Sequence, residues 1–374
     1  MAAETPSSGD LTAEQRAGGT AGAGDDDGDG RTGRSRRQRR HRALSAIGAL
    51  LLVLVLLTAG LAWYATARYA GNITRIPGVF AGLDESTRPA PPSPAPGSGD
   101  VTLTFLLVGV DSEDRGNGSD ALADTDQQSA DVLMLVQIAA SRDSAVAVSL
   151  PRTSTVPVPG YGSQPIGSAF IEGGPSLLVQ TVEALTQVRI DHYVSVDFAG
   201  FAEITDAFGG VDVRVAAQSS ARGLSLTQGV NHLNGEQALA YVRQRSGLPG
   251  GELDRVQRHQ NYLRAMMTTI SRENLLTDPG RLDDFLLALT DALSVDDTLS
   301  DFDVVSLMLS LRELTPADLT FLTVPVNRTE PAPPRPPQSL SLDAARAAQM
   351  WSYLREGSLQ SHAGEFDQLA RAPR

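Results

Sequence analysis

VTLTFLLVGV, at residues 101–110, is an almost unbroken apolar run that is followed directly by Asp111. Two more runs of this kind follow, DVLMLVQI at residues 131–138 and AVAVSL at residues 145–150. Short, nearly continuous apolar runs are typical of strands that are covered on both faces of a sheet. We therefore predict three buried strands at the centre of the fold.

Helical and strand patterns alternate after residue 150. The expected helices lie at residues 175–187, 198–208, 236–243, 254–273, 281–293, 301–311 and 342–354. The expected strands lie at residues 191–196, 211–215 and 319–324. Asn234 is a suitable cap for the helix at residues 236–243. Strands alternating with helices predict the α/β class, here a layered α-β-α domain with a central mixed sheet.

The N-terminal part of the chain has the pattern of a membrane anchor. Residues 1–42 are polar, lack apolar periodicity and end in a basic run with seven arginines between residues 31 and 42. The uncharged run ALSAIGALLLVLVLLTAGLAW follows at residues 43–63 and is long enough to span a bilayer as a helix. We predict a disordered cytoplasmic tail at residues 1–42 and a single transmembrane helix at residues 43–67, with the N-terminus inside.

A cleaved signal peptide is the alternative to this anchor. The apolar run is longer than a usual signal sequence, and TAGLA is a mediocre cleavage site, so we favour the uncleaved anchor. The rest of the chain then lies outside the cytoplasmic membrane. It is expected to comprise a Pro-rich linker at residues 68–100, an extracellular domain at residues 101–325, and a Pro-rich segment with a C-terminal helix and tail at residues 326–374.

Composition excludes several kinds of site. The 374-residue chain has a net charge of −13, which argues against nucleic-acid binding. It has no cysteine, so disulfides, zinc–thiolate sites and cysteine nucleophiles are excluded. It has no lysine either, which is typical of a GC-rich genome, so the position of each arginine matters more than the number of arginines.

Four arginines fall within sixteen residues of this acidic chain, at positions 243, 245, 255 and 258. If the strands at residues 101–110 and 131–138 are antiparallel, Asp111 and Asp131 lie at one edge of the sheet, where Arg152 follows the third strand. Two aspartates beside several arginines predict a site for a divalent metal and phosphate. The alternative is that the aspartates form turns and that the arginines make surface ion pairs with Glu252 and Asp254.

The chain resembles the LytR-CpsA-Psr family of membrane-anchored cell-wall glycopolymer ligases, of the actinobacterial type, between about residues 101 and 263. The resemblance rests on motifs in a shared order and spacing. They are LLVGVD at 106–111, ADVLMLV at 130–136, SLPR at 149–152, GGP at 173–175 with LLV at 177–179, IDHY at 190–193, DFAGF at 197–201, GGVD at 209–212, LNGEQALAYVR at 233–243 and DRVQR at 254–258.

The resemblance implies an enzyme that moves a glycopolymer, as glycosyl-phosphate, from a polyprenyl-pyrophosphate carrier to a peptidoglycan hydroxyl. It implies Mg²⁺, or Mn²⁺ in its place, held by Asp111 and Asp131, and an apolar pocket for the lipid tail. It also implies a set of residues that contact the pyrophosphate. We expect Arg152, Arg243, Arg245 and Arg255 to be catalytic, Arg258 and Gln260 to add pyrophosphate contacts, and Glu252 to support them.

The sequence departs from the family pattern in four places. Ser129 stands where the family usually has arginine, Thr153 where it has aspartate, PIG at residues 165–167 where it has Lys-Ile-Asn, and Glu252 where it has aspartate. The first two changes motivate a second hypothesis, a non-catalytic binder of polyprenyl-pyrophosphate glycans. A membrane-bound transcriptional regulator is a third reading, suggested only by the basic tail, which membrane topology already explains.

Other candidate residues have ordinary structural explanations. His192 lies in an apolar strand pattern and is expected to be structural, and His259 is expected to be solvated or to support the site. Six apolar residues are candidates for the lipid pocket, although most are expected to belong to the ordinary core. They are Phe105, Leu107, Phe170, Phe198, Phe201 and Val242.

Overall fold

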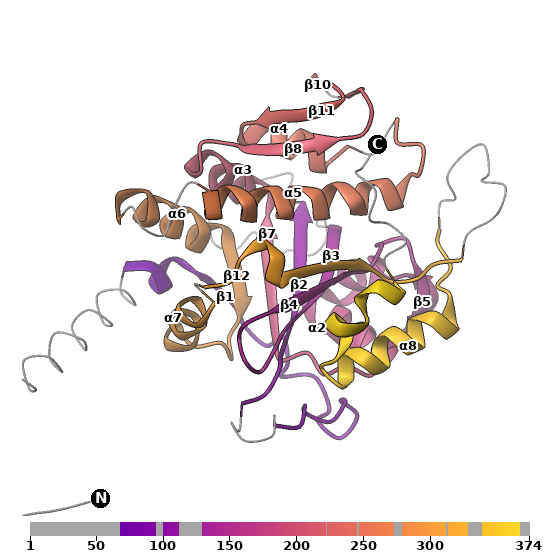
Figure 1. Ribbon diagram of the computed structural model, residues 1–374. Coiled ribbons are helices and arrows are strands. Elements are labelled where there is room, and N and C mark those ends of the chain that lie inside the picture. Colours follow the sequence, from indigo (N-terminus) through magenta and orange to yellow (C-terminus); the bar gives the residue numbers. More distant parts are fainter. Residues whose placement is uncertain are drawn as a thin grey trace, which may run out of the picture. The chain divides into compact units, whose positions relative to one another are not determined.

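The computed structural model describes residues 68–94, 100–111, 129–221, 223–244, 247–272, 279–311, 313–327 and 339–366, all within the compact unit Ala62–Arg374 (Figure 1). The predicted tail and transmembrane helix lie outside these residues. Within the described ranges no helix combines the length and the apolarity that crossing a membrane requires.

A seven-stranded sheet organises the described part of the chain (Figure 1). In spatial order its strands are β1 (Thr74–Ile76), β12 (Leu293–Asp296), β7 (His192–Asp197), β2 (Leu103–Asp111), β3 (Ser129–Ile138), β4 (Ala145–Ser149) and β13 (Leu319–Thr323). β2 pairs in parallel with β7 and antiparallel with β3, and β4 pairs antiparallel with β3 and in parallel with β13. The predicted central mixed sheet is therefore confirmed, as is the antiparallel pairing of the first two predicted strands.

Helices cover both faces of the sheet. The side chains of Leu106, Val108 and Leu135 pack on one face with α2 (Ser168–Thr186) and α8 (Ala344–Arg355). The alternate side chains of β2, including Phe105 and Leu107, face a layer of four other helices. These are α3 (Phe198–Ala207), α5 (Glu252–Arg272), α6 (Pro279–Ala292) and α7 (Asp301–Ser310). This arrangement gives the predicted α-β-α layers.

A smaller cluster of β-structure packs on α5. β8 (Val211–Val215) pairs antiparallel with β11 (Gly229–Leu233), and β9 (Ser219–Ala221) pairs with β10 (Leu224–Leu226). α4 (Gly235–Val242) follows β11 and begins at a capping box in which Asn234 and Gln237 bond reciprocally, so the predicted cap is confirmed. Buried residues of β8, α4 and α5 form one apolar cluster, which fixes α4 against α5.

Short elements complete the described chain. β5 (Thr155–Val158) and β6 (Gly162–Pro165) form a hairpin, and 3₁₀ turns lie at η1 (Ala70–Asn72), η4 (Pro316–Asp318) and η5 (Leu359–Glu365).

Two segments outside the predicted domain of residues 101–325 also join the fold. β1, which lies within the predicted linker, pairs with β12, and Arg88 forms a buried ion pair of 2.8 Å with Glu183 of α2. At the other end, α8 contributes Met350, Trp351 and Leu354 to the main core. A strand of three residues carries too little periodicity to be recognised in sequence, which explains why the predicted linker includes β1.

Candidate functional site

A β-bulge at the edge of the sheet places Asp131. Gly109 pairs with Val132 and Val110 pairs with Ala130, so Asp131 is an extra residue in β3 without an opposite residue in β2. Bulges of this kind bend a strand and redirect a side chain. A side chain at Gly109 would not fit, because its Cβ would lie 2.9 Å from the Cβ of Val132. The bulge thus directs the nearly buried carboxylate of Asp131 to the place where β3 begins and the antiparallel strand β4 ends.

Four charged side chains, Asp131, Arg152, Glu252 and Arg255, meet at this point, and we call them the charged cluster. One oxygen of Asp131 accepts from Arg152 and lies 3.8 Å from Nη1 of Arg255. Glu252 accepts from Nη2 of Arg255 at 2.8 Å and from the backbone N–H of Arg152 at 3.2 Å. The predicted convergence of Asp131, Arg152 and Arg255 is therefore present in the structure, with Glu252 supporting it.

The cluster is buried but retains binding capacity. The side chain of Arg255 is 3% exposed and that of Arg152 is 23% exposed. Nε of Arg255 is buried and has no acceptor among the described residues. The forked guanidinium group of arginine suits phosphate oxygens. Glu252 is the first residue of α5, so a phosphate bound here would also lie at the positive end of that helix dipole. The cluster has the chemistry of an anion site whose charge is balanced internally.

The remaining predicted site residues fall into two groups. Asp111 pairs through its backbone with Ser129, next to the bulge, and Arg243 is the half-buried C-cap of α4. These two residues thus lie on segments that adjoin the cluster: Asp111 beside the bulge in β2, and Arg243 on α4, which packs against α5. Arg245 lies outside the described residues.

Arg258 and Gln260 contact protein groups instead. Arg258 is fully buried, donates to Gln244 at 2.6 Å and stacks 4.7 Å from the ring centre of Tyr241. The amide of Gln260 donates to the hydroxyls of Ser149 and Thr323, both at 2.9 Å. These contacts join α4 and the edge of the sheet to α5. Pyrophosphate contacts by Arg258 and Gln260 stay predictions.

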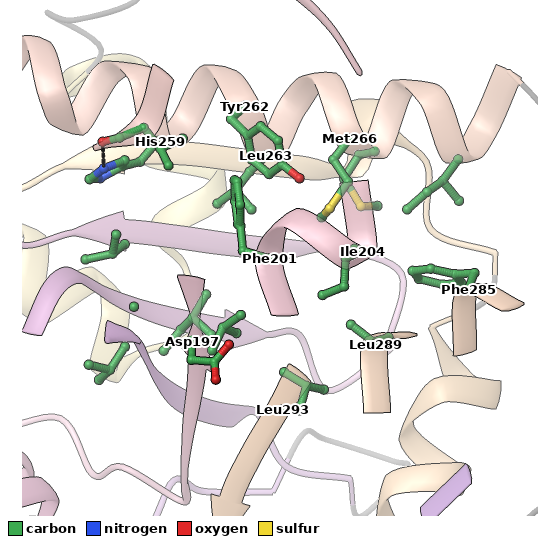
Figure 2. A pocket seen from close by; sticks show the side chains of 18 residues that line it. Asp197, Phe201, Ile204, His259, Tyr262, Leu263, Met266, Phe285, Leu289 and Leu293 are labelled. Carbon is green, nitrogen blue, oxygen red and sulfur yellow. Dashed lines mark hydrogen bonds between the residues drawn. The ribbon is translucent and has the colours of Figure 1, made fainter. Parts of the chain in front are cut away.

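An apolar cavity of about 360 Å³ begins beside the charged cluster, and we call it the proximal cavity (Figure 2). It lies between the sheet and helices α3, α5 and α6. Val132, which follows Asp131, and His259, one turn after Arg255, line its near end, whereas Phe285 and Leu289 line its far end. Figure 2 shows Tyr262, Leu263 and Met266 along α5 above Phe201, Ile204 and Leu289.

Three of the six apolar residues that are candidates for the lipid pocket line the proximal cavity. Leu107, Phe201 and Val242 line it. Phe105 lies farther along β2, and Phe170 belongs to the core on the opposite face of the sheet. The side chain of Phe198 is outside the described part of the structure. The expectation that most of the six belong to the ordinary core is thus only partly met.

His259 separates the charged cluster from the apolar cavity. It is 6% exposed, so of the two expectations for this residue, solvated or supporting the site, the first is wrong. Burial, followed by the positive charge of Arg255, lowers the pKa of His259 to about 4, and a hydrogen bond of 3.0 Å to the carbonyl oxygen of Val242 opposes this shift. The imidazole is therefore neutral at pH 7, and its Nε2–H donates to that carbonyl.

Asp131 is paired with Arg152, and this pairing limits how the carboxylate would hold a metal ion. Among the described side chains there is no group of three or more His, Asp or Glu residues placed to hold a metal ion. Mg²⁺ commonly takes only one or two carboxylates and completes its shell with water and substrate phosphate. A site of this second kind needs no more than one or two carboxylates, and Asp131 is one such group at this end of the sheet.

The wall that α5 contributes to the proximal cavity was not among the predicted site residues. His259, Tyr262, Leu263, Met266, Met267 and Ile270 all line the proximal cavity. Their spacing of three and four residues continues from Arg255 along one face of the helix. That periodicity was visible in the sequence, but it also fits an ordinary buried helix face.

Known proteins are similar to this chain in sequence and in fold. Residues 84–355 match the LytR_cpsA_psr family. The cell wall biosynthesis protein LcpA of Corynebacterium glutamicum is 29% identical over 231 residues, which are 54% of this chain and 44% of LcpA. A TagU of Bacillus mycoides, named polyisoprenyl-teichoic acid–peptidoglycan teichoic acid transferase, is 36% identical over 38% of this chain and 47% of TagU. The chain thus covers less than half the length of either relative.

A solved structure supports the fold independently. The LytR-Csp2A-Psr enzyme from Actinomyces oris superposes with a TM-score of 0.57 and 22% sequence identity, and the match covers 75% of this chain and 94% of that one. At this identity the similarity concerns the fold.

Proposed function

The chain belongs to the LytR_cpsA_psr family, and we propose that it transfers a glycopolymer, as glycosyl-phosphate, from a polyprenyl-pyrophosphate carrier to a peptidoglycan hydroxyl. The name of the TagU relative, which combines a polyisoprenyl-linked donor with a peptidoglycan acceptor, supports this choice of substrates.

One observation carries the proposal: a single helix presents both a charged and an apolar site. The first turn of α5 provides Glu252 and Arg255 to the charged cluster, and the same helix lines the proximal cavity from His259 to Ile270. At about 1.5 Å per residue, Arg255 and Ile270 are about 22 Å apart along the helix. A ligand with a phosphate head and a long hydrocarbon tail matches this arrangement.

The proposed reaction is a displacement at phosphorus. The acceptor hydroxyl forms a bond to the phosphorus that carries the glycan, the bond to the lipid phosphate breaks, and the hydroxyl proton is lost to solvent or to a base. Charge accumulates on the phosphate oxygens as this happens. Arg152 pairs with Asp131 and Arg255 with Glu252, so both guanidinium groups are held at one place, where they could stabilise that charge.

We assign Asp111 and Asp131 as the residues that would hold Mg²⁺, which would supply additional charge neutralisation at the phosphates. Arg243 and Arg245 are proposed to complete the arginine side of the site. The anchor expected at residues 43–67 supports a location in the cytoplasmic membrane with the domain outside. There the lipid-borne donor is concentrated, which favours encounter with the cavity.

The test measures release of polyprenyl phosphate by the full chain in detergent, with a lipid-linked glycan donor, peptidoglycan and Mg²⁺. We expect release with the unsubstituted chain and a loss of about 100-fold or more in Arg152→Ala. Arg214→Ala, at an exposed arginine on β8, is the matched control and should keep full activity. Binding of the donor without release on any acceptor would refute the transferase and favour the non-catalytic binder.

The non-catalytic binder has one structural observation in its favour. Thr153 stands where the family usually has aspartate, and its buried hydroxyl has no hydrogen-bond partner among the described residues. A carboxylate at this position is thus missing from the loop that carries Arg152. Restoring it by Thr153→Asp separates the two hypotheses: the substitution should create release only if the unsubstituted chain is an inactive binder.

A further inference from the structure

Helix α7 exposes large apolar side chains on the side that faces away from the sheet. Phe302 is 72% exposed and Leu309 is 58% exposed, more than any other large apolar residue that the structure describes. The two residues are seven positions apart, which is about two turns of a helix, so they point in the same direction. The half-buried Val305 lies between them on the same side. We call this apolar strip the outer face of α7.

The opposite side of α7 is apolar as well. Val304 is buried in a core cluster that includes Phe105 and Leu299, and Leu307 and Met308 pack against that cluster. A short helix that is apolar on all sides is typical of a helix that is covered on all sides, by protein or by a membrane. The described part of the chain leaves the outer face uncovered, so the cover is expected to come from elsewhere.

Two aspartates in the first turn of α7 have partners within the protein. Asp301 forms an ion pair with Arg75 of β1. Asp303 closes a capping box, in which it accepts from the hydroxyl and the backbone N–H of Ser300. Both carboxylates also lie at the positive end of the helix dipole, which stabilises them there. The acidic residues of α7 are thus engaged at one end of the helix, and they leave its outer face available for an apolar contact.

The start of the described chain, drawn in indigo in Figure 1, lies beside α7. The short turn η1 contacts both α6 and α7. Arg68 and Tyr69 donate to the two carboxylate oxygens of Asp283 on α6, at 2.9 and 2.7 Å. A few residues later, β1 pairs with β12. Residues 68–76 are therefore fixed to the domain, although the sequence predicted them to be part of a linker.

We propose that the outer face of α7 rests on the membrane, with Phe302 and Leu309 inserted among the lipid acyl chains. This inference rests on the anchor proposed at residues 43–67, which ends immediately before Arg68. A helix that spans the bilayer and ends at residue 67 brings Arg68 to the membrane surface. Because the segment that follows is fixed to α6 and β12, the side of the domain that carries α7 is held close to that surface.

The chemistry of the outer face suits the boundary between lipid headgroups and acyl chains. An amphipathic helix that lies in this boundary buries its apolar side about 5–10 Å deep. On α7 the inner side is anchored in the protein core, so only the protruding side chains of the outer face enter the lipid. Such a contact would hold the domain in one orientation, whereas a single anchor would let it rotate at the membrane surface.

The test exploits the absence of cysteine from the chain. Phe302→Cys and Leu309→Cys each provide a single site for an environment-sensitive fluorophore, and the labelled full chain is reconstituted into vesicles of phosphatidylglycerol and phosphatidylcholine. Val230→Cys is the matched control, because Val230 is 53% exposed on β11, well apart from α7 in Figure 1. Lipids with a nitroxide near the top of the acyl chain should quench the probes on α7 about threefold more than the control probe, or better.

A second substitution tests whether the outer face acts as a unit. Phe302→Glu, added to the Leu309→Cys protein, should reduce quenching of the probe by the nitroxide lipid, whereas Val230→Glu should leave it unchanged. Equal lipid quenching of the probes at residues 302 and 230 overturns the proposal. It is also overturned if the probe at residue 302 is shielded from aqueous iodide without being quenched by lipid, because a second copy or another protein then covers α7.

Extraction with alkaline carbonate separates failure of this inference from failure of the anchor. The unsubstituted chain should stay with the vesicles. If it stays but the outer face shows no lipid quenching, the anchor stands and the proposed contact of α7 is wrong. Release of the unsubstituted chain by carbonate would instead refute the anchor and the proposed location in the membrane, on which this inference rests.

Discussion

Replacing His259 by glutamine should remove a large part of the acid sensitivity of the fold. Burial, and then the charge of Arg255, lower the pKa of the imidazole to about 4 in the folded protein, against the ordinary value of 6.5. Between these values the unfolded chain binds a proton that the folded chain does not, so stability increases with pH. The contribution is complete above about pH 6.5 and is lost as the pH falls towards about 4.

The size of this effect follows from the same pKa values. At about 1.4 kcal/mol per pH unit, the interval between about 4 and 6.5 corresponds to about 3 kcal/mol of unfolding free energy. Such a loss is a large fraction of the stability of a typical domain, about 5–15 kcal/mol. The unsubstituted chain should therefore lose about 3 kcal/mol more than His259→Gln between about pH 7 and about pH 4.

Urea unfolding of the full chain in detergent, followed at both pH values, measures the difference. Glutamine retains an N–H donor for the carbonyl oxygen of Val242 but cannot take up a proton, so comparison with His259→Gln cancels the titration of the carboxylates. His232→Gln changes an exposed histidine and should follow the unsubstituted chain. If His259→Gln loses the same free energy as the unsubstituted chain on acidification, the buried neutral imidazole is not the cause.

Three other substitutions test separate parts of the structure. Tyr241→Phe removes the 2.9 Å hydrogen bond from Asn261 and should lower the unfolding free energy by about 1 kcal/mol in urea titrations. Gly235→Ala would place a Cβ 2.3 Å from the carbonyl oxygen of Ala202, so we expect a loss of about 1–3 kcal/mol and a lower melting temperature. Arg243→Ala should reduce polyprenyl phosphate release about 100-fold and leave the melting temperature unchanged. A clearly lower melting temperature in this variant would mean that Arg243 supports the fold, which would contradict a role in the site.

The central strands could be predicted because burial on both faces leaves an unbroken apolar run. The proximity of Asp111 and Asp131 could be predicted too, since it needs only that two such runs pair antiparallel. The bulge that directs Asp131 towards Arg152 could not be predicted. It depends on which residue of β3 is left unpaired, and the apolar pattern on either side of Asp131 is compatible with regular pairing.

Two arginines of α5 show why the direction of a helix side chain could not be predicted from the sequence. Arg255 and Arg258 are three residues apart and look equivalent in the sequence. In the structure Arg255 joins Glu252 and Asp131, whereas Arg258 stacks on Tyr241. Which of the two faces the sheet edge depends on the rotation of α5, and that rotation is fixed by the apolar residues that form the cavity wall.

The charge balance of the cluster leads to a prediction about Mg²⁺. Asp131 and Glu252 offset the charges of Arg152 and Arg255, so a pyrophosphate that enters alone meets little net positive charge. Asp131 would hold the proposed Mg²⁺, whose positive charge would add to that of the guanidinium groups at the phosphates. Asp131→Asn should therefore bind inorganic pyrophosphate more tightly than the unsubstituted chain when Mg²⁺ is absent, and should gain less affinity when Mg²⁺ is added. Calorimetric titrations of both proteins, with and without Mg²⁺, measure the two effects. An equal gain from Mg²⁺ in both proteins would mean that Asp131 serves only to position the arginines.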